Sequence, residues 1–446
     1  MKNIKIALWA TPAVLTLLWL AATLPFAEEL GFFTVRNYLV QYSGVIATGV
    51  MSLGMILAIR LGWIEGWLNG LDKSYRLHKW LGIMALVTSI IHWLASEFPK
   101  WMVGLGWLQR PRRGPRPGGA TELSELQQFF NSQRGLAEVI GEWAFYAAVV
   151  LIALALIKRF PYKYFVSTHM LISVAYLAVV IHSVPLLTYD DWATPIGVLS
   201  ALLMIGGTYA ALLSLTRRIG RRNQIKGTIE HIRNFPELRA TEIVLALEDK
   251  WQGHHAGQFA FATFDKREGK HPFTIASAWD KETKAITFIT KGLGDYTNFL
   301  PEKLKTGNEV IVEGPYGRFT FDDDKDRQIW IGGGIGITPF IARMKQLAKT
   351  SNRKTIDLIH STKEMSPEAL DLLKADAENA GINLHVMVDD RDGFLTGDLL
   401  RKMVPEWQSA SFWFCGPAGF GQALRNDLLK QGLAAAEFKQ ELFNMR

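Results

Sequence analysis

The chain has 446 residues, of which 49% are hydrophobic, and its formal net charge is +7. Its one cysteine, Cys415, excludes an intramolecular disulfide and any metal site built from several cysteines. Much of the basic excess lies at the ends of apolar segments, which favours a role in membrane topology over nucleic-acid binding, so no nucleic-acid partner is expected.

The first half of the chain is dominated by long apolar runs. Six stretches contain no Asp, Glu, Lys or Arg, and they are residues 6–27, 37–59, 80–96, 143–157, 164–189 and 192–216. A membrane crossing takes roughly 20 helical residues, so four stretches are long enough alone and the third and fourth need their flanks. A cleaved signal peptide at residues 1–27 is disfavoured, because no small-residue cleavage site follows. The pattern predicts an integral membrane protein with six spans in a lipid bilayer.

The distribution of Lys and Arg predicts the orientation of these spans. Basic residues gather at the N-terminus, between the second and third spans, between the fourth and fifth, and after the sixth. The positive-inside rule then places both termini and the second half of the chain in the cytoplasm. One outer connection, residues 97–142, disagrees. It is either a solvated loop or a basic cover that recruits an anionic acceptor or a partner protein, and its basic patch consists of Arg110, Arg112, Arg113 and Arg116.

Four histidines lie within or at the ends of the third and fifth spans, namely His78, His92, His169 and His182. Their spacings of 14 and 13 residues separate the two rings on each helix by roughly 20 Å along its axis. If the helices meet, two stacked His–His pairs result, which is the axial ligation of a b-type haem. Hydrogen bonding to a neighbouring helix is the alternative for a membrane histidine. A 13-residue step changes helix face, so the fifth span is expected to contain a bulge, an overwound turn or a bend.

Two segments around these histidines resemble the haem-ligand segments of the NADPH oxidase and ferric reductase superfamily. They are Asp72-Lys-Ser-Tyr-Arg-Leu-His78-Lys-Trp and Thr168-His169-Met-Leu. The resemblance covers essentially the whole chain and is nearest to bacterial six-span members with a fused reductase domain. It implies an inner haem on His78 and His169, the inner pair, and an outer haem on the outer pair, His92 and His182.

The second half reads as a soluble protein with two kinds of pattern. Residues 223–322 hold short β-branched and aromatic runs bounded by Gly and Pro, which predicts a small antiparallel barrel. Residues 326–446 alternate apolar strands with helical stretches, which predicts a parallel sheet of βαβ units. With the resemblance, the expected fold is multidomain: an α-helical six-span di-haem bundle at 1–222, an FAD-binding antiparallel β-barrel at 223–322, and an α/β NAD(P)H-binding domain at 323–446.

The segment His271-Pro-Phe-Thr-Ile-Ala-Ser277 resembles the flavin motif of ferredoxin-reductase-like enzymes, although an ordinary β-hairpin remains an alternative. The resemblance implies that Phe273 stacks on the isoalloxazine, that Thr274 hydrogen-bonds near flavin N5, and that His271 faces the pyrophosphate. The FAD-site residues implied in this way are His271, Pro272, Phe273, Thr274, Ser277, Lys291, Gly294, Tyr296, Thr297, Gly314 and Gly317.

An apolar strand then runs into glycines and a helical stretch, where the backbone can approach a pyrophosphate at a helix N-terminus. The spacing is not the usual dinucleotide fingerprint, but it is similar to the reductase family's version, which implies a cysteine beside the nicotinamide. A buried small hydrophobe is the alternative for that cysteine. The implied nucleotide-site residues are Gly332, Gly333, Gly334, Gly336, Thr338, Ser361, Lys363, Cys415, Gly416 and Pro417.

The choice of nucleotide depends on the second strand of this domain. Ser361 and Lys363 could hold a 2′-phosphate, which favours NADPH over NADH, whereas Glu364 opposes a second anion there. Near the end of the chain, Phe443 is implied to cover the flavin until the nicotinamide displaces it. Catalytic roles are thus expected for Thr274, Cys415 and Phe443.

These parts predict an oxidoreductase that passes electrons from NAD(P)H through FAD and two b haems to an outer acceptor. A hydride carries two electrons and haem iron accepts one, so a flavin must stand between them. The acceptor is O2, giving superoxide, or a ferric chelate. Arg36, at the outer start of the second span, is either a partner of a haem propionate or an interface anchor. The alternatives are an electron donor to a dedicated extracytoplasmic protein and a flavin reductase merely anchored by six helices.

Overall fold

The computed structural model describes the chain except for residues 1, 28–29, 110–123, 158, 351–353 and 442–446. The chain divides into two compact units, the first built chiefly from Met1–Leu68 and Lys73–Ile219 and the second chiefly from Gly220–Asn444. Five residues of the sequence predictions lie outside the described residues, namely Arg110, Arg112, Arg113, Arg116 and Phe443.

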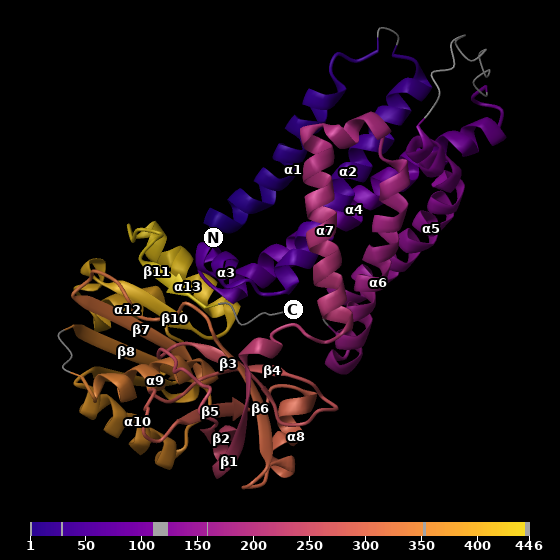
Figure 1. The fold of residues 1–446 in the computed structure, drawn as a ribbon. Coiled ribbons are helices and arrows are strands. Elements are labelled where there is room, and N and C mark those ends of the chain that lie inside the picture. The colour runs from indigo at the N-terminus through magenta and orange to yellow at the C-terminus, as the bar shows by residue number, and fades with distance from the viewer. Residues whose placement is uncertain (1, 28–29, 110–123, 158, 351–353, 442–446) are drawn as a thin grey trace. The chain divides into compact units, whose positions relative to one another are not determined.

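Long helices make up the first unit and run side by side (Figure 1). Six of them are long and apolar enough to cross a membrane, which confirms the predicted spans. The third and fourth extend well beyond their charge-free cores, because their polar flanks continue the helix. Their bounds are α1 Lys2–Thr23, α2 Phe32–Ala58, α4 Leu71–Gly104, α5 Glu125–Leu156, α6 Tyr162–Leu186 and α7 Pro195–Leu215, with a short α3 at Gly62–Leu68.

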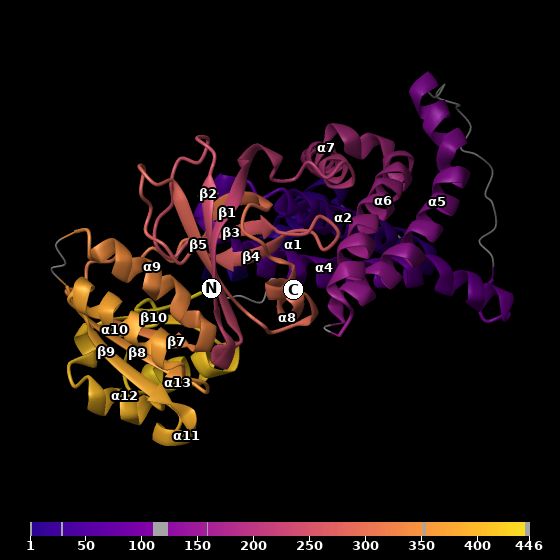
Figure 2. The same cartoon turned by 90° about the horizontal axis from the view of Figure 1, so that it is seen from below.

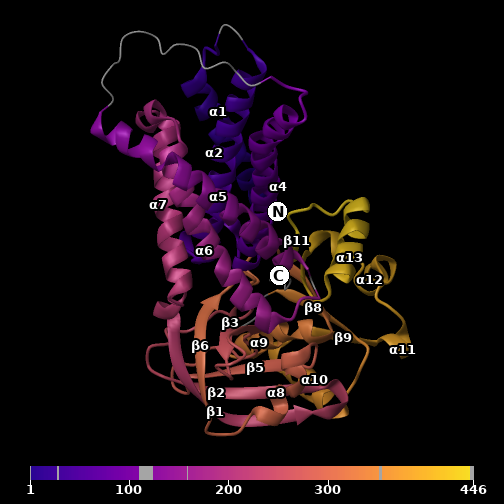
Figure 3. The ribbon, with the colours of Figure 1, turned by 90° about the vertical axis from the view of Figure 1, so that its right-hand side faces the viewer.

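The centre of this bundle is closely packed around one tyrosine. Tyr176 on α6 is fully buried, and its hydroxyl lies 2.8 Å from the Ser52 hydroxyl of α2. Gly207 on α7 makes room for it, since a Cβ there would lie 2.0 Å from the tyrosine oxygen. Helix α2 packs against α1 and α7, and α5 packs against α6 (Figure 3). Of the described helices that could span a membrane, α4 has the backbone that lies farthest from those of the others.

The second unit begins with an antiparallel six-stranded sheet, sheet A, of order β4-β3-β6-β1-β2-β5 (Figure 2). Its inward side chains alternate along the strands, so that Ile243 and Leu245 of the second strand are fully buried. Ile275, which directly follows β4 at one end of this order, forms an isolated antiparallel β-bridge with Phe288 of β5 at the other end. The antiparallel sheet was predicted, and its closure into a barrel stays a prediction. The bounds are β1 Gln224–Phe235, β2 Ala240–Leu247, β3 Phe259–Thr263, β4 His271–Thr274, β5 Ala285–Lys291, β6 Glu309–Tyr316 and α8 Asp295–Lys303.

A parallel five-stranded sheet, sheet B, follows, with order β11-β10-β7-β8-β9. Trp330 of its first strand packs with α9 and α10, and its neighbours Ile329 and Ile331 pack with α12 and α13 on the opposite face (Figure 1). This three-layer arrangement confirms the predicted parallel α/β architecture. The strands are β7 Arg327–Gly333, β8 Thr355–Thr362, β9 Asn383–Val388, β10 Ser411–Cys415 and β11 Phe438–Gln440, and the helices are α9 Thr338–Leu347, α10 Pro367–Ala380, α11 Asp389–Asp392, α12 Gly397–Met403 and α13 Ala418–Lys430.

Candidate functional site

The structure brings the four membrane histidines together as two pairs, each made by one residue of α4 and one of α6. The ring centroids of the inner pair, His78 and His169, are 5.7 Å apart, with the ring planes at 64°. Those of the outer pair, His92 and His182, are 6.2 Å apart at 88°. Two imidazole nitrogens bound to one metal at about 2 Å each would put the centroids about 6 Å apart.

The irregularity expected in the fifth span takes no visible form as a bulge. Helix α6 is α-helical throughout Tyr162–Leu186, which rules out the bulge, whereas the alternatives of an overwound turn or a bend stay predictions. Both pairs form despite the 13-residue step, because each imidazole turns about two side-chain bonds and need not follow the direction of its Cα–Cβ vector.

Backbone carbonyls of other helices hold three of the four imidazoles. The Nδ1–H of His78 donates to the Gly54 carbonyl at 2.9 Å, and that of His182 donates to the Ala137 carbonyl at 2.8 Å. His92 Nδ1 lies 3.0 Å from the Val40 carbonyl in the same way. A carbonyl only accepts, so Nδ1 carries the hydrogen and Nε2 keeps its lone pair for a metal.

His169 is the exception among the four. Within the part of the chain that the structure describes, its Nδ1 has no hydrogen-bond partner although the atom is buried. The Phe165 ring, one turn earlier on α6, lies nearly parallel to the imidazole with centroids 5.1 Å apart. This ring is therefore positioned by an aromatic contact.

The donor set of these pairs fits a haem. Over the described residues, no group of three or more His, Cys, Asp or Glu is placed to hold a metal ion. A structural zinc site needs four such ligands, whereas a haem supplies its own equatorial nitrogens and needs two axial histidines.

Arg36 contacts helix α4, which carries His92 of the outer pair. Its Nε donates to the Ala95 carbonyl and its Nη2 to the Ser96 carbonyl, each at 3.3 Å. Pro99, four residues after Ala95, has no N–H to donate to that carbonyl, so the guanidinium takes the place of the missing helical hydrogen bond. Its predicted contact with a haem propionate stays a prediction.

In sheet A, the predicted flavin motif lies on strand β4. The His271 ring stacks on Tyr296 of α8, with centroids 4.2 Å apart and planes at 12°. Burial lowers the pKa of His271 to about 4, so the ring is neutral at physiological pH. It can donate a hydrogen bond to a diphosphate but brings no full charge. Phe273 and Thr274 are buried, and the Phe273 ring packs near Phe288.

The other predicted flavin residues lie on β4, β6 and α8 and in the loops next to these elements. The Thr297 hydroxyl accepts hydrogen bonds from the backbone N–H groups of Leu293 and Gly294, which caps the start of α8. Gly317 has φ +102°, a conformation that favours glycine. The remaining members are Pro272 on β4, Gly314 on β6 and Ser277, whose hydroxyl accepts from the Thr287 N–H at 3.0 Å.

Lys291 makes an ion pair that the sequence did not indicate. Its Nζ lies 2.5 Å from a Glu364 carboxylate oxygen, and Arg239 approaches the other oxygen at 3.4 Å. The negative charge of Glu364 is therefore already compensated. With its charge compensated, Glu364 opposes a 2′-phosphate less than the sequence alone suggested.

The predicted nucleotide segments meet at one edge of sheet B. Gly332, the next-to-last residue of β7, pairs with Cys415, which ends β10. Glycine is required at Gly336, because a Cβ there would lie 2.2 Å from the Cys415 carbonyl oxygen. Gly333 packs on Gly416 and Pro417, Ser361 pairs with Gly333 at the end of β8, and Thr338 begins α9.

The strand order turns at this point, because β8 and β9 extend from β7 on one side and β10 and β11 on the other. The carboxyl edge at such a switch point is where open α/β sheets bind ligands. Cys415 is fully buried there, and its burial, with the nearby Glu441 charge, raises the pKa of the thiol well above its usual range. The group therefore stays a neutral thiol.

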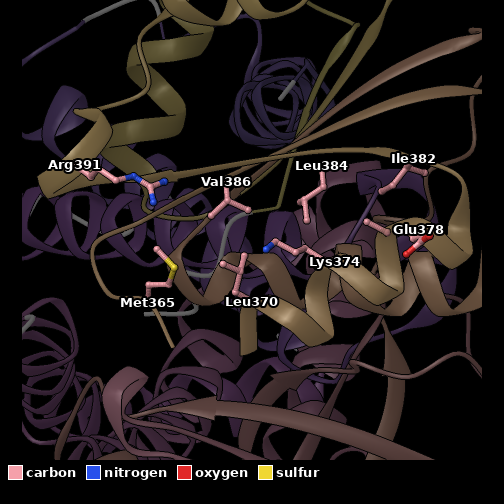
Figure 4. A pocket seen from close by; sticks show the side chains of 9 residues that line it. Met365, Leu370, Lys374, Glu378, Ile382, Leu384, Val386 and Arg391 are labelled. Carbon is pink, nitrogen blue, oxygen red and sulfur yellow. The ribbon is translucent and has the colours of Figure 1, made fainter. Parts of the chain in front are cut away.

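Two hollows border sheet B. The smaller, of about 140 Å³, is lined by Gly334, Lys291 and Glu364 among others, and so includes predicted site residues. The larger, of about 550 Å³, lies between α10 and the edge strand β9 and contains none of them (Figure 4). His360 also lines the smaller hollow, although it was not among the predicted site residues. Its Nδ1 lies 3.1 Å from the Gly332 carbonyl oxygen. Its place one residue before Ser361 on a predicted strand was the available signal.

Comparison with known proteins supports both halves of this description. Residues 43–180 match the family described as ferric reductase like transmembrane component. A flavohemoprotein of Xylella fastidiosa is 27% identical over 43% of this chain and 51% of its own, and the glycine betaine monooxygenase reductase subunit of Chromohalobacter salexigens is 25% identical over 34% and 44%. The chain thus spans about half the length of the curated relatives it matches.

Among solved structures, a flavohemoglobin from Malassezia yamatoensis covers 96% of this chain and 98% of its own at 17% identity, with a TM-score of 0.47. A likeness at this level carries no argument about function. The sequence relatives do bear on it: a ferric-reductase-like transmembrane domain is joined in this chain to a part related to flavohemoproteins and reductase subunits, as the resemblance to the NADPH oxidase and ferric reductase superfamily predicted.

Proposed function

We propose that the chain is a transmembrane flavocytochrome that passes electrons from cytoplasmic NAD(P)H to an acceptor at the outer face. The observation that carries this proposal is the pair of His–His contacts between α4 and α6, at 5.7 Å and 6.2 Å between ring centroids. Three of the four rings donate through Nδ1 to a carbonyl and keep Nε2 for a metal.

The placement of the pairs supports two haems at different depths. Fourteen residues of helix separate His78 from His92, which is roughly 20 Å along the axis of α4. Helix α4 also approaches the other described spans least closely, as expected of a helix separated from its neighbours by planar groups. Haem b and FAD, when bound, supply one-electron transfer and hydride acceptance, respectively.

The second unit supplies the residues for the two nucleotides. We assign FAD to a closed barrel within residues 223–322 and NAD(P)H to residues 323–446. The glycine turn beside Cys415 lets a pyrophosphate approach the N-terminus of α9. Neutral His271 and the capped start of α8 would bind the FAD diphosphate through hydrogen bonds, and buried Cys415 would border the nicotinamide without attacking it.

The electron balance is simple. One NAD(P)H is oxidised to NAD(P)+ with release of one proton, and its two electrons reduce two O2 to superoxide or two ferric ions of a chelate to ferrous ions. Two histidines on each haem would leave its iron no open site, so the acceptor would take its electron without binding to iron. The basic residues at span ends support a cytoplasmic position for both termini and for the nucleotide sites.

The test is anaerobic stopped-flow spectroscopy of the purified full-length chain with FAD and NADPH, followed by separate addition of O2 or ferric citrate. We expect a Soret band that shifts on reduction and is restored by one of the acceptors, with superoxide formed if that acceptor is O2. A chain that reduces flavin but shows no Soret band is an anchored flavin reductase. Reduced haem that neither acceptor reoxidises indicates a donor to a dedicated protein partner.

A further inference from the structure

Each of the three carbonyls that hold the histidines is followed, four residues later, by glycine or alanine. Residue i+4 is Gly44 for Val40, Gly141 for Ala137 and Ala58 for Gly54. In an α-helix each side chain leans toward the N-terminus and covers the turn before it, so the side chain at i+4 lies over the carbonyl at i. Glycine or alanine at i+4 leaves that carbonyl open to a second hydrogen bond.

Two of these i+4 positions leave little or no room for a side chain. A Cβ on Gly141 would lie 2.1 Å from His182 Nδ1, a distance that no side chain can occupy. A Cβ on Gly44 would lie 3.2 Å from His92 Cε1, which is tight. The third i+4 position, Ala58, already carries a Cβ, and His78 still reaches the Gly54 carbonyl at 2.9 Å. The two close approaches therefore both concern the outer pair.

We propose that Gly44 and Gly141 are positioning residues of the outer haem. This role rests on the proposed function, because the two glycines act by leaving the Val40 and Ala137 carbonyls accessible to the ligands His92 and His182. Each hydrogen bond fixes the plane of its imidazole and increases electron donation by the ligand to the iron. Both histidines of the outer pair are held in this way, whereas among the described residues a carbonyl holds the inner pair through His78 alone.

The experiment compares Gly141→Ala and Gly44→Ala with a matched control, Gly135→Ala, in the full-length, haem-loaded chain. Gly135 lies on the same helix as Gly141, and a Cβ on it would meet nothing within 4 Å. The control therefore reproduces the gain in helix propensity without the contact. The readouts are haem per chain, the reduced-minus-oxidised spectrum, and the midpoint potentials of the two haems. His92→Ala identifies the signal of the outer haem.

For Gly141→Ala we expect haem affinity at the outer site to fall by about 10- to 100-fold, the range seen when partners of a ligand are lost. Outer haem that remains bound should have a raised midpoint potential, because a less donating imidazole favours the ferrous state. Gly44→Ala should act on the same haem more weakly, and Gly135→Ala should leave both haems unchanged.

The inner haem serves as the internal control for folding. If Gly141→Ala leaves the outer haem unchanged, or changes it no more than Gly135→Ala does, the proposal is overturned. If Gly141→Ala removes both haems, the milder Gly44→Ala decides: a shift confined to the outer haem supports the proposal, and no shift or an equal shift of both overturns it. A native chain without haem would instead refute the proposed function, which is a different result.

Discussion

The two units of the chain bury polar side chains in opposite ways. In the membrane unit, backbone carbonyls of neighbouring helices hold three of the four histidines as neutral rings. In the second unit, the carboxylate of Asp323, whose side chain is 9% exposed, accepts hydrogen bonds from Lys354 at 2.8 Å and Lys439 at 2.9 Å. Burial pushes the pKa of Asp323 upward, but its hydrogen bonds, with Lys354 first, hold it well below the usual range.

The difference follows from the surroundings. A charge inside a bilayer has no water to reach, so a neutral donor paired with a backbone acceptor is the stable solution. The lysines around Asp323 remain about a third exposed, so their ammonium groups keep part of their hydration while pairing with it. Breaking one contact should therefore cost cofactor binding in the first unit and folding stability in the second.

The largest effect is expected from His92→Ala. Loss of an axial ligand should remove the outer haem and slow reduction of the outer acceptor by more than about 100-fold, beyond the range for second-sphere partners. Haem content and anaerobic reduction rates measure this, with His255→Ala on the second unit as the control. Flavin reduction by NADPH should be unchanged. Retention of two haems per chain would show that His92 is not a ligand.

Asp323→Ala tests the second unit. It leaves Lys354 and Lys439 without their shared carboxylate and also frees the Ser411 hydroxyl, so we expect the unit to lose roughly 2–4 kcal/mol of stability. Urea-dependent pulse proteolysis of the full chain measures this, and the exposed neighbour Asp324→Ala is the control. The haem spectrum should not change. Equal stability of the two variants would mean that the ion pairs around Asp323 contribute nothing.

Acidification is expected to act on the second unit through buried histidines. Burial lowers the pKa values of His254 and His360 to about 4. Between the unfolded value near 6.5 and about 4, only the unfolded chain binds the proton, so stability is full above pH 6.5 and falls as the pH drops. The contribution of His254 is up to about 3 kcal/mol.

His254→Gln removes this titration and can still donate to the Ser277 carbonyl, which His254 Nε2 contacts at 2.9 Å. Hydrogen exchange of peptides around residues 251–279 should therefore depend less on pH in the variant than in the native chain, between pH 7 and pH 5. His255→Gln, next to it on the surface, is the matched control. An unchanged pH dependence in His254→Gln would rule out this histidine as the cause.

The smallest effect is expected from Glu364→Gln. The change removes a negative charge near Ser361 and Lys363 and releases Lys291, so kcat/KM for NADPH relative to NADH should rise by about 2- to 5-fold, the scale of a partly exposed ion pair. Steady-state kinetics with both nucleotides measures the ratio. Glu368→Gln, an exposed partner of Arg233, is the control. If both variants give the same ratio, the 2′-phosphate does not lie near Glu364.

Several features could be predicted from the sequence because they depend on residues close together in the chain. Apolar length alone predicts the six spans, and the 14- and 13-residue spacings place two histidines on each of two helices. The alternation of apolar strands and helices predicts sheet B, and the rule for parallel strands then places Gly332 and Cys415 at one edge.

Only the tertiary structure decided which partner each side chain meets. The carbonyls of Val40 and Ala137 lie some 50 residues from the histidines they hold, and their availability depends on how the helices cross. Two other contacts also join residues far apart in the sequence. Arg36 donates to the Ala95 carbonyl that Pro99 leaves free, and Lys291 pairs with Glu364. Local patterns in a sequence determine the elements and their faces, whereas contacts between distant residues depend on the packing of whole elements, which no short pattern contains.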